Sequence, residues 1–319
     1  SPPTIFSVMD APFAVEAENI FFSYASELPV LRGLSMRVER GCFACVLGHS
    51  GCGKSTLLNL VMGLSRPSSG VVKINGAEAE GPGTDRAIVF QDCSLFPWMT
   101  AQENVAFAIR HTRKITKQAS AALAADFLSQ VGLYESRGKY PNQLSGGMKQ
   151  RVAIARALAM DSEIWLFDEP FSGFDPVNAN LLKNEILALR DAGATIVFST
   201  HNMSSVEEIC DHITLIDRSR NVLSGPVDEV RRRHGGNVFR IDFAGDLSAL
   251  DLQALERVAR VVAEPRPKGR LLTMRLQLPS ADSVRSALSL LNERVEIRGF
   301  EEIIPSMNDI FIRAVGGEL

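Results

Sequence analysis

The residues from Gly48 to Ser55 combine glycines, a lysine and a hydroxyl at the spacing of a phosphate-binding loop. The string Gly-His-Ser-Gly-Cys-Gly-Lys-Ser fits G-x-x-x-x-G-K-[ST] and lies between an apolar segment and a helical one. Glycine permits a tight turn whose backbone N–H groups point at phosphate oxygens, and the following helix adds its positive N-terminal end. We expect Lys54 to neutralise the outer phosphates, Ser55 to ligate Mg²⁺ and Thr56 to add a hydroxyl near the α-phosphate. The residues expected to bind phosphates are Gly48, His49, Ser50, Gly51, Cys52, Gly53, Lys54, Ser55 and Thr56.

Two adjacent carboxylates follow an apolar run further along the chain. Residues 164–167, Ile-Trp-Leu-Phe, predict a buried strand, and Asp168 and Glu169 stand at its end. Carboxylate oxygens are ligands that Mg²⁺ prefers, so Asp168 is a candidate magnesium ligand, directly or through water. Capping of the next turn is the alternative reading of such a pair. Their position downstream of a phosphate loop favours the metal.

A second glycine-rich turn provides another candidate anion site. Leu144-Ser145-Gly146-Gly147-Met148 opens a segment that predicts a helix over residues 146–160. Backbone N–H groups at the start of a helix are unpaired and attract anions. Ser145, Gly146 and Gly147 are therefore expected to bind phosphate as well.

Taken together, these segments resemble the ATP-binding subunits of ABC transporters over about residues 15–235. The resemblance implies bound ATP and Mg²⁺, and an ATPase activity coupled to transport. In that family the residue matching Glu169 polarises the attacking water. Gln91, in Val89-Phe90-Gln91-Asp92, matches a glutamine that senses Mg²⁺ and couples to the membrane partner. His201 matches a histidine that contacts the γ-phosphate, although a lone histidine at a strand end is often an ordinary surface residue.

The same resemblance implies that two subunits share each active site. The turn from Ser145 to Gly147 would complete the site of a second nucleotide-binding subunit, most simply a second copy. Asp175, in Ser172-Gly173-Phe174-Asp175, would reach across that dimer, with Phe174 where leucine is more usual. Tyr24 occupies the position of an aromatic that stacks on adenine, and an ordinary core tyrosine is the alternative.

The order of the elements predicts an α/β fold. Strands are expected at residues 43–47, 87–90, 164–167, 195–199 and 213–217, with helices in between. Such alternation is typical of a parallel sheet. A helical subdomain at about residues 92–160 interrupts that alternation. We expect an ABC-type P-loop core at residues 1–235 and a small α+β domain at residues 236–319. Strands are expected there at residues 238–243, 261–264, 271–278 and 295–300, and helices at residues 247–260 and 283–292. This order, β-α-β-β-α-β, predicts a ferredoxin-like fold for the small domain.

Composition narrows the class of protein further. The net charge is −3, with 45% hydrophobic and 22% charged residues, which does not favour nucleic acid as a partner. No apolar run approaches the roughly 20 residues of a spanning helix, and no signal peptide is visible. We therefore expect a cytoplasmic protein, peripheral on the inner face of the membrane, whose transport path belongs to a separate permease.

The five cysteines fit a reducing compartment. Cys42 and Cys45 lie in an apolar strand and are expected to be buried. Cys52 stands inside the phosphate loop near a helix N-terminus, a position that can lower the pKa of a thiol.

Two subfamilies are evident within the resemblance. Residues 81–100 and 139–144 resemble ATPases that import nitrate, sulfonate or taurine, whose systems include a periplasmic substrate-binding protein. Residues 170–178, 222–225 and 304–311 resemble ATPases of ABC-2 exporters, including sodium-efflux types. A natural mosaic and an engineered fusion would give the same pattern.

The helical subdomain is expected to choose the permease, so small-anion import is favoured and an ABC-2 exporter is the alternative. A soluble ABC ATPase is disfavoured because the chain has one nucleotide-binding core and no coiled-coil or zinc insertion. A GTPase is disfavoured because no N-K-x-D motif occurs.

Overall fold

The computed structural model describes residues 12–24, 28–171, 176–245, 255–280 and 283–317. The chain forms two compact units, Ser1–Pro226 and Val227–Leu319. The predicted boundary after residue 235 lies beyond this division, because helix α8 (Val227–Arg233) belongs to the second unit. Asp175 lies outside the described residues.

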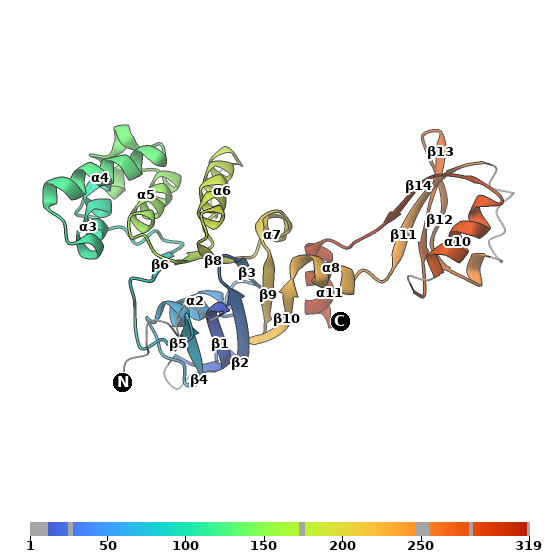
Figure 1. The fold of residues 1–319 in the computed structure, drawn as a ribbon, viewed down its shortest axis with the longest axis horizontal. Coiled ribbons are helices and arrows are strands. Elements are labelled where there is room, and N and C mark those ends of the chain that lie inside the picture. The colour runs from blue at the N-terminus through green and yellow to red at the C-terminus, as the bar shows by residue number, and fades with distance from the viewer. Residues whose placement is uncertain (1–11, 25–27, 172–175, 246–254, 281–282, 318–319) are drawn as a thin grey trace. The chain divides into compact units, whose positions relative to one another are not determined.

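A six-stranded sheet forms the centre of the first unit (Figure 1). Its spatial order is β10-β9-β3-β8-β7-β6, and the pairs β3/β8, β3/β9, β7/β8 and β6/β7 are parallel. Every residue of β3, β7 and β8 is buried, as expected for strands covered on both faces. The strands are β3 (Phe43–Leu47), β6 (Arg86–Val89), β7 (Ile164–Asp168), β8 (Thr195–Thr200), β9 (His212–Asp217) and β10 (Arg220–Pro226).

A second, antiparallel sheet lies on the other side of helix α2 (Lys54–Met62) (Figure 1). Apolar side chains of α2, from Leu57 onward, share one core with both sheets. The order of the antiparallel sheet is β2-β1-β4-β5. Its strands are β1 (Phe13–Phe22), β2 (Leu31–Glu39), β4 (Ser69–Ile74) and β5 (Ala77–Glu78).

The predicted helical subdomain is a group of three helices with a core of its own (Figure 1). They are α3 (Ala101–Arg113), α4 (Lys117–Gln130) and α5 (Gly146–Leu158). Thr100, Thr116 and Ser145 cap their N-termini, each side chain accepting a backbone N–H from the first turn. Two further helices of the first unit, α6 (Pro176–Asp191) and α7 (Met203–Ile209), connect β7, β8 and β9.

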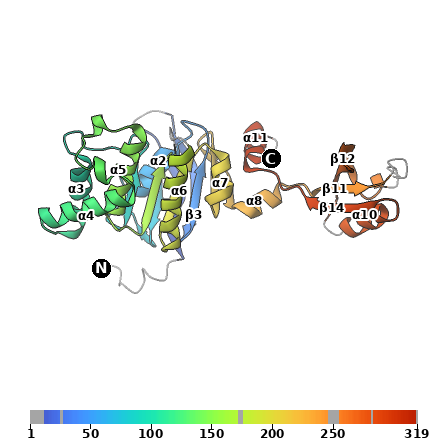
Figure 2. The same ribbon diagram turned by 90° about the horizontal axis from the view of Figure 1, so that it is seen from above.

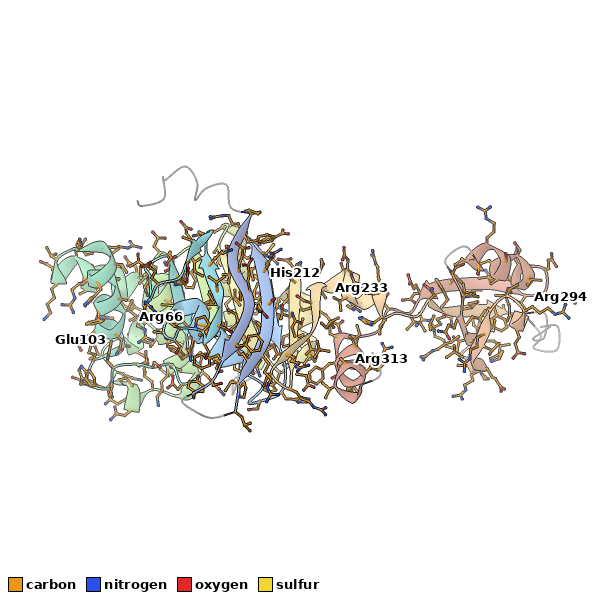
Figure 3. The ribbon with its side chains drawn as sticks, turned by 90° about the horizontal axis from the view of Figure 1, so that it is seen from below. Arg66, Glu103, His212, Arg233, Arg294 and Arg313 are labelled. Atoms are coloured by element: carbon orange, nitrogen blue, oxygen red, sulfur yellow. The ribbon has the colours of Figure 1, made fainter. Side chains whose placement is uncertain are left out.

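The second unit contains a four-stranded antiparallel sheet of order β12-β13-β11-β14, the order of a ferredoxin-like sheet. Helix α10 (Ser283–Asn292) packs Ala287 and Leu291 against one face of it (Figure 2). Helix α11 (Met307–Gly316) lies beside α8, and Arg313 donates from Nη2 to the carbonyl of His234 at 3.2 Å (Figure 3). The strands are β11 (Val238–Ala244), β12 (Arg260–Lys268), β13 (Leu271–Gln277) and β14 (Glu296–Glu302).

Several element predictions need correction. A strand was expected only over residues 261–264, whereas β12 continues through Pro265 and Pro267 to Lys268. Proline is tolerated there because β12 is an edge strand, whose outer N–H groups need no partner. The edge strand β10 and the short helix α8 were not predicted at all. Most of the helix expected over residues 247–260 lies outside the described residues.

Candidate nucleotide-binding site

The phosphate loop joins β3 to α2 and depends on glycine for its shape. Gly48, Gly51 and Gly53 have φ of +154°, +79° and +108°. A Cβ on Gly48 would lie 2.4 Å from both the Cys52 sulfur and the Ile216 carbonyl oxygen, so no larger residue fits there. A Cβ on Gly51 would meet nothing within 4 Å. The loop is therefore packed on its inner side and open at Gly51, as a cradle for an anion requires.

Lys54 points back into this loop. Its Nζ donates to the carbonyls of Gly48 (2.9 Å) and His49 (3.1 Å) and lies 3.4 Å from Glu169 Oε1. The side chain is only 6% exposed, so its positive charge is held at the floor of the loop. A phosphate entering the loop would find an ammonium group that is already positioned.

The carboxylates at the end of β7 are oriented by the neighbouring strand β8. Ser199 Oγ donates to Asp168 Oδ1 at 2.5 Å. The Glu169 N–H donates to both the carbonyl oxygen and the Oγ of Ser199, each at 3.2 Å. Glu169 has φ of +48°, which is uncommon for a residue with a side chain. One buried serine thus holds both acidic residues and stabilises a strained backbone at the second.

Glu169 lies between a lysine and a histidine. Its Oε2 is 2.9 Å from His201 Nδ1, and its Oε1 faces Lys54. The Glu169 side chain is 12% exposed, whereas that of His201 is 66% exposed. The carboxylate is therefore partly withdrawn from water, and the imidazole reaches it from the solvent side.

The remaining predicted residues lie at different distances from this centre. Gln91 follows β6 at the same carboxyl edge of the sheet, with its side chain exposed. Tyr24 Oη is 3.3 Å from Thr56 Oγ1, and 48% of the residue is exposed, so its ring remains available beside the loop. Ser145 caps the N-terminus of α5, and Gly146 and Gly147 form the start of that helix, in the helical subdomain.

Two parts of the chain match known protein families. Residues 31–172 match the family "ABC transporter", and residues 225–315 match "ATP-binding protein DrrA1-3-like, C-terminal domain". The bicarbonate transport ATP-binding protein CmpD of Synechocystis sp. is 42% identical over 201 residues, which cover 62% of this chain and 71% of that protein. The nitrate import ATP-binding protein NrtD of Synechococcus elongatus is 41% identical over 202 residues, which cover 63% and 74%.

The chain belongs to the ABC transporter ATP-binding family. A solved structure of the ATP-binding cassette MJ0796, a dimer bound to ADP and phosphate after hydrolysis, supports this with a TM-score of 0.62. It is 28% identical, and the match covers 67% of this chain and 98% of that one. The chain is thus an ABC ATPase with an α/β core, as the sequence predicted, and it binds ATP.

The sequence of this ABC ATPase did not reveal the role of Ser199, and it gave a wrong expectation for Cys52. Ser199 was not singled out, because its contacts with Asp168 span 31 positions in the chain and no local motif marks them. The expectation for Cys52 was wrong. Burial raises the pKa of its thiol, and the nearby Lys54 offsets this only in part. Cys45 is buried as expected, and Cys42 is partly buried.

The residues present fit the magnesium ion that the family implies. Asp168 is buried at the end of β7 with its Oδ1 held by Ser199, and Ser55 is exposed at the start of α2. A carboxylate and a hydroxyl are hard oxygen donors of the type that Mg²⁺ prefers.

Proposed function

We propose that this chain is the ATP-hydrolysing subunit of an importer of small anions, acting with a separate membrane permease. The relatives named for bicarbonate transport and nitrate import support this proposal, since each is about two-fifths identical over the nucleotide-binding core. Within the described residues, no helix is long and apolar enough to cross a bilayer. We place the chain on the cytoplasmic face of the membrane, where ATP is available.

The site residues would divide the work as follows. The loop N–H groups and Lys54 bind the phosphates, while Ser55, Gln91 and Asp168 are positioned to hold Mg²⁺. That ion, when bound, neutralises phosphate charge and helps align the reacting groups. Lys54 exchanges its loop carbonyls and its contact with Glu169 for phosphate oxygens. Glu169 is then released from the lysine and can accept a hydrogen bond from water.

His201 and Ser199 would orient Glu169 for that step. The Glu169 backbone is anchored to β8 through Ser199, and His201 Nδ1 lies 2.9 Å from its carboxylate. As the imidazole is exposed, His201 is free to turn from Glu169 to a γ-phosphate. A general base held in this way contributes typically 10²–10⁴-fold to the rate.

A second subunit would complete each site. Ser145, Gly146 and Gly147 lie exposed or partly exposed at the start of α5, where their unpaired N–H groups can bind the phosphate of a partner chain. Asp175 is proposed to contact that partner, and Tyr24 to stack on adenine. The dimeric post-hydrolysis structure of the cassette MJ0796 supports a paired arrangement.

Glu169→Gln tests the catalytic part of this proposal. The amide keeps the size of the side chain and cannot act as a base, so we expect hydrolysis to fall at least 100-fold while ATP binding is kept. The variant should then accumulate as an ATP-bound dimer in size-exclusion chromatography. Hydrolysis at the wild-type rate would remove Glu169 from the mechanism.

Uptake of labelled bicarbonate and nitrate tests the transport part. Cells that lack the chain should lose uptake of one of these anions, or of a small sulfonate such as taurine. The wild-type chain should restore that uptake and Glu169→Gln should not. A periplasmic binding protein for the same anion is expected to belong to the system.

The match of residues 225–315 to the DrrA1-3-like C-terminal domain favours one alternative, an ATPase of an ABC-2 exporter. Under that alternative the same deletion would leave anion uptake intact and slow the efflux of an intracellular ion such as sodium. Isolation of the chain from detergent-solubilised membranes would then yield a permease of the ABC-2 class.

A further inference from the structure

The segment that follows Gln91 has an uncommon backbone conformation. Cys93 and Ser94 are consecutive residues with φ of +64° and +40°. Side chains rarely adopt this left-handed region, so the turn depends on contacts that hold it. Within the segment, Cys93 N–H donates to the Phe90 carbonyl (3.0 Å), and the N–H and Oγ of Ser94 donate to Asp92 Oδ1 (3.1 and 2.6 Å).

Three further hydrogen bonds to this turn come from α5, the helix that begins with Gly146 and Gly147. Arg156 donates from Nη1 to the Ser94 carbonyl (2.7 Å) and from Nη2 to the Cys93 carbonyl (3.0 Å). The Cys93 thiol donates to Gln150 Oε1 at 3.2 Å. Two residues of α5 therefore hydrogen-bond to the backbone and the side chain of the turn that follows Gln91.

The hydrogen bond between Cys93 and Gln150 is shielded from water. Gln150 is 4% exposed and Cys93 is 6% exposed. Burial also lowers the pKa of the Arg156 guanidinium from its ordinary value. The Arg156 side chain is partly buried. Its planar fork fits two neighbouring carbonyls as a lysine ammonium cannot.

The other end of the segment, at residues 96–99, is also hydrogen-bonded to the helical subdomain, through α3. Asn104, fully buried on α3, accepts from the Phe96 N–H (2.8 Å) and donates to the carbonyls of Phe96 and Met99. The chain from residue 93 to residue 100 is therefore hydrogen-bonded to both α3 and α5. Gln91 is the last predicted ligand residue before this attachment.

We propose that Arg156, together with Gln150 and Cys93, is a positioning device that sets the Gln91 loop and the Ser145–Gly147 turn in a fixed relation. Nucleotide contact at Gln91 of one subunit then places the turn that this subunit offers to the partner's nucleotide. The inference rests on the proposed two-subunit site. It assigns to Arg156 no contact with ATP.

ATP-driven dimerisation of the full chain tests the inference, with Glu169→Gln as the background that prevents turnover. The ATP concentration for half-maximal dimer formation is measured by size-exclusion chromatography with light scattering. Binding of a fluorescent ATP analogue to dilute monomer is measured separately. Arg156→Ala should raise the first concentration about tenfold, the effect of losing hydrogen bonds from a charged donor. Analogue affinity should change less than about twofold, because the phosphate loop is untouched.

Conservative variants separate positioning from folding. Arg156→Lys keeps the charge and loses the fork, so it should show most of the alanine effect. Cys93→Ala should raise the half-maximal ATP concentration about threefold, the effect of a neutral hydrogen bond, and Cys93→Ser should restore it. The double variant Arg156→Ala, Cys93→Ala should show less than the product of the single effects, because both act on one turn.

Arg151→Ala is the matched control. Arg151 lies on the same helix and donates to a backbone carbonyl, that of Val131 at 3.2 Å inside the helical lobe. If it lowers thermal stability as much as Arg156→Ala but leaves dimerisation at the original ATP concentration, the effect of Arg156 is positional. Equal losses of dimerisation in the two variants would overturn the inference. So would unchanged dimerisation in Arg156→Lys and Cys93→Ala, which remain informative if Arg156→Ala does not fold.

Glu169→Gln without further substitutions tests the two-subunit site separately from the positioning role of Arg156. If Glu169→Gln alone forms no dimer at any ATP concentration, the proposed two-subunit site fails. If it dimerises and the Arg156 variants do so at the same ATP concentration, only the positioning role fails.

Discussion

At the scale of single residues, Glu169 is oriented by a neighbour that performs no chemistry itself. Ser199 is completely buried, donates to Asp168, and accepts from the Glu169 N–H. Its hydroxyl therefore links the candidate metal ligand to the candidate base. Because β7 and β8 are parallel and Asp168 is in register with Ser199, any residue at 199 must face this pair.

We predict that Ser199→Ala lowers kcat about 10- to 100-fold. The substitution leaves Asp168 Oδ1 without its buried donor, at a cost of about 1–3 kcal/mol. The Glu169 N–H keeps the Ser199 carbonyl, so folding should survive. Steady-state ATPase assays give kcat and KM. Thr200→Val is the control, since its hydroxyl accepts from the Asn202 N–H and does not contact the carboxylates. Equal effects of the two variants would contradict the prediction.

Lys54→Ala should abolish productive ATP binding. Removal of the ammonium leaves the carbonyls of Gly48 and His49 facing the phosphates with no positive charge between them. We expect nucleotide affinity to fall at least tenfold, measured by titration calorimetry. Lys183→Ala is a suitable control, because this lysine pairs with Glu208 on the neighbouring helix. Unchanged affinity in Lys54→Ala would count against the phosphate-loop assignment.

The candidate site residues could be selected from the sequence because most of them lie in contiguous strings. The phosphate loop, the strand-end carboxylates and the Ser145–Gly147 turn are each local in the chain. Ser199, Gln150 and Arg156 were not singled out, since their partners lie 31, 57 and 62–63 positions away. Strand pairing and helix docking create such contacts, and no short motif records them.

At the scale of elements, the helices of the lobe are defined by their first turns. Thr100 and Glu103 form a reciprocal capping box on α3, with the Glu103 N–H donating to Thr100 Oγ1 and the Thr100 N–H donating to Glu103 Oε2. Thr116 caps α4 through Ala119 N–H alone. The two helices thus provide the same cap with and without a carboxylate.

We predict that Thr100→Ala and Thr116→Ala each destabilise the chain by about 1 kcal/mol at neutral pH. Only the α3 cap should depend on pH. Its hydrogen bonds hold the pKa of Glu103 below its ordinary value of 4.5. That contribution is present above about pH 4.5 and is lost as the pH falls through the lower pKa of the folded state. Urea unfolding followed by circular dichroism checks this, and an equal acid loss in Glu103→Gln would refute it.

Buried strands were predicted more accurately from the sequence than strands at the edges of the sheets. The interior strands were placed to within a few residues because their apolar runs are continuous. The edge strands β10 and β12 were missed or shortened, because polar residues and prolines there are permitted by position in the sheet and not by sequence pattern. The sequence shows the prolines, but it does not show that the strand lies at the edge of the sheet.

At the scale of the whole molecule, the two units have separate apolar cores. One core of the first unit joins α2 to both of its sheets, and another lies within the helical lobe. The core of the second unit is built from β11, β13 and α10. All the residues assigned to nucleotide belong to the first unit, so a ligand should stabilise that unit alone.

We predict two unfolding transitions in scanning calorimetry, of which nucleotide raises only one. Ligand at about one hundred times its Kd adds about 2.7 kcal/mol to the state that binds it. Core variants should assign the transitions, because truncating a fully buried aliphatic side chain costs about 2–5 kcal/mol. Leu57→Ala on α2 should lower the transition that responds to ADP, and Ile241→Ala on β11 should lower the other. A single transition that both variants lower and ADP raises as a whole would mean that the second unit unfolds with the ATPase core, and would give residues 227–319 a direct share in the stability of the nucleotide site.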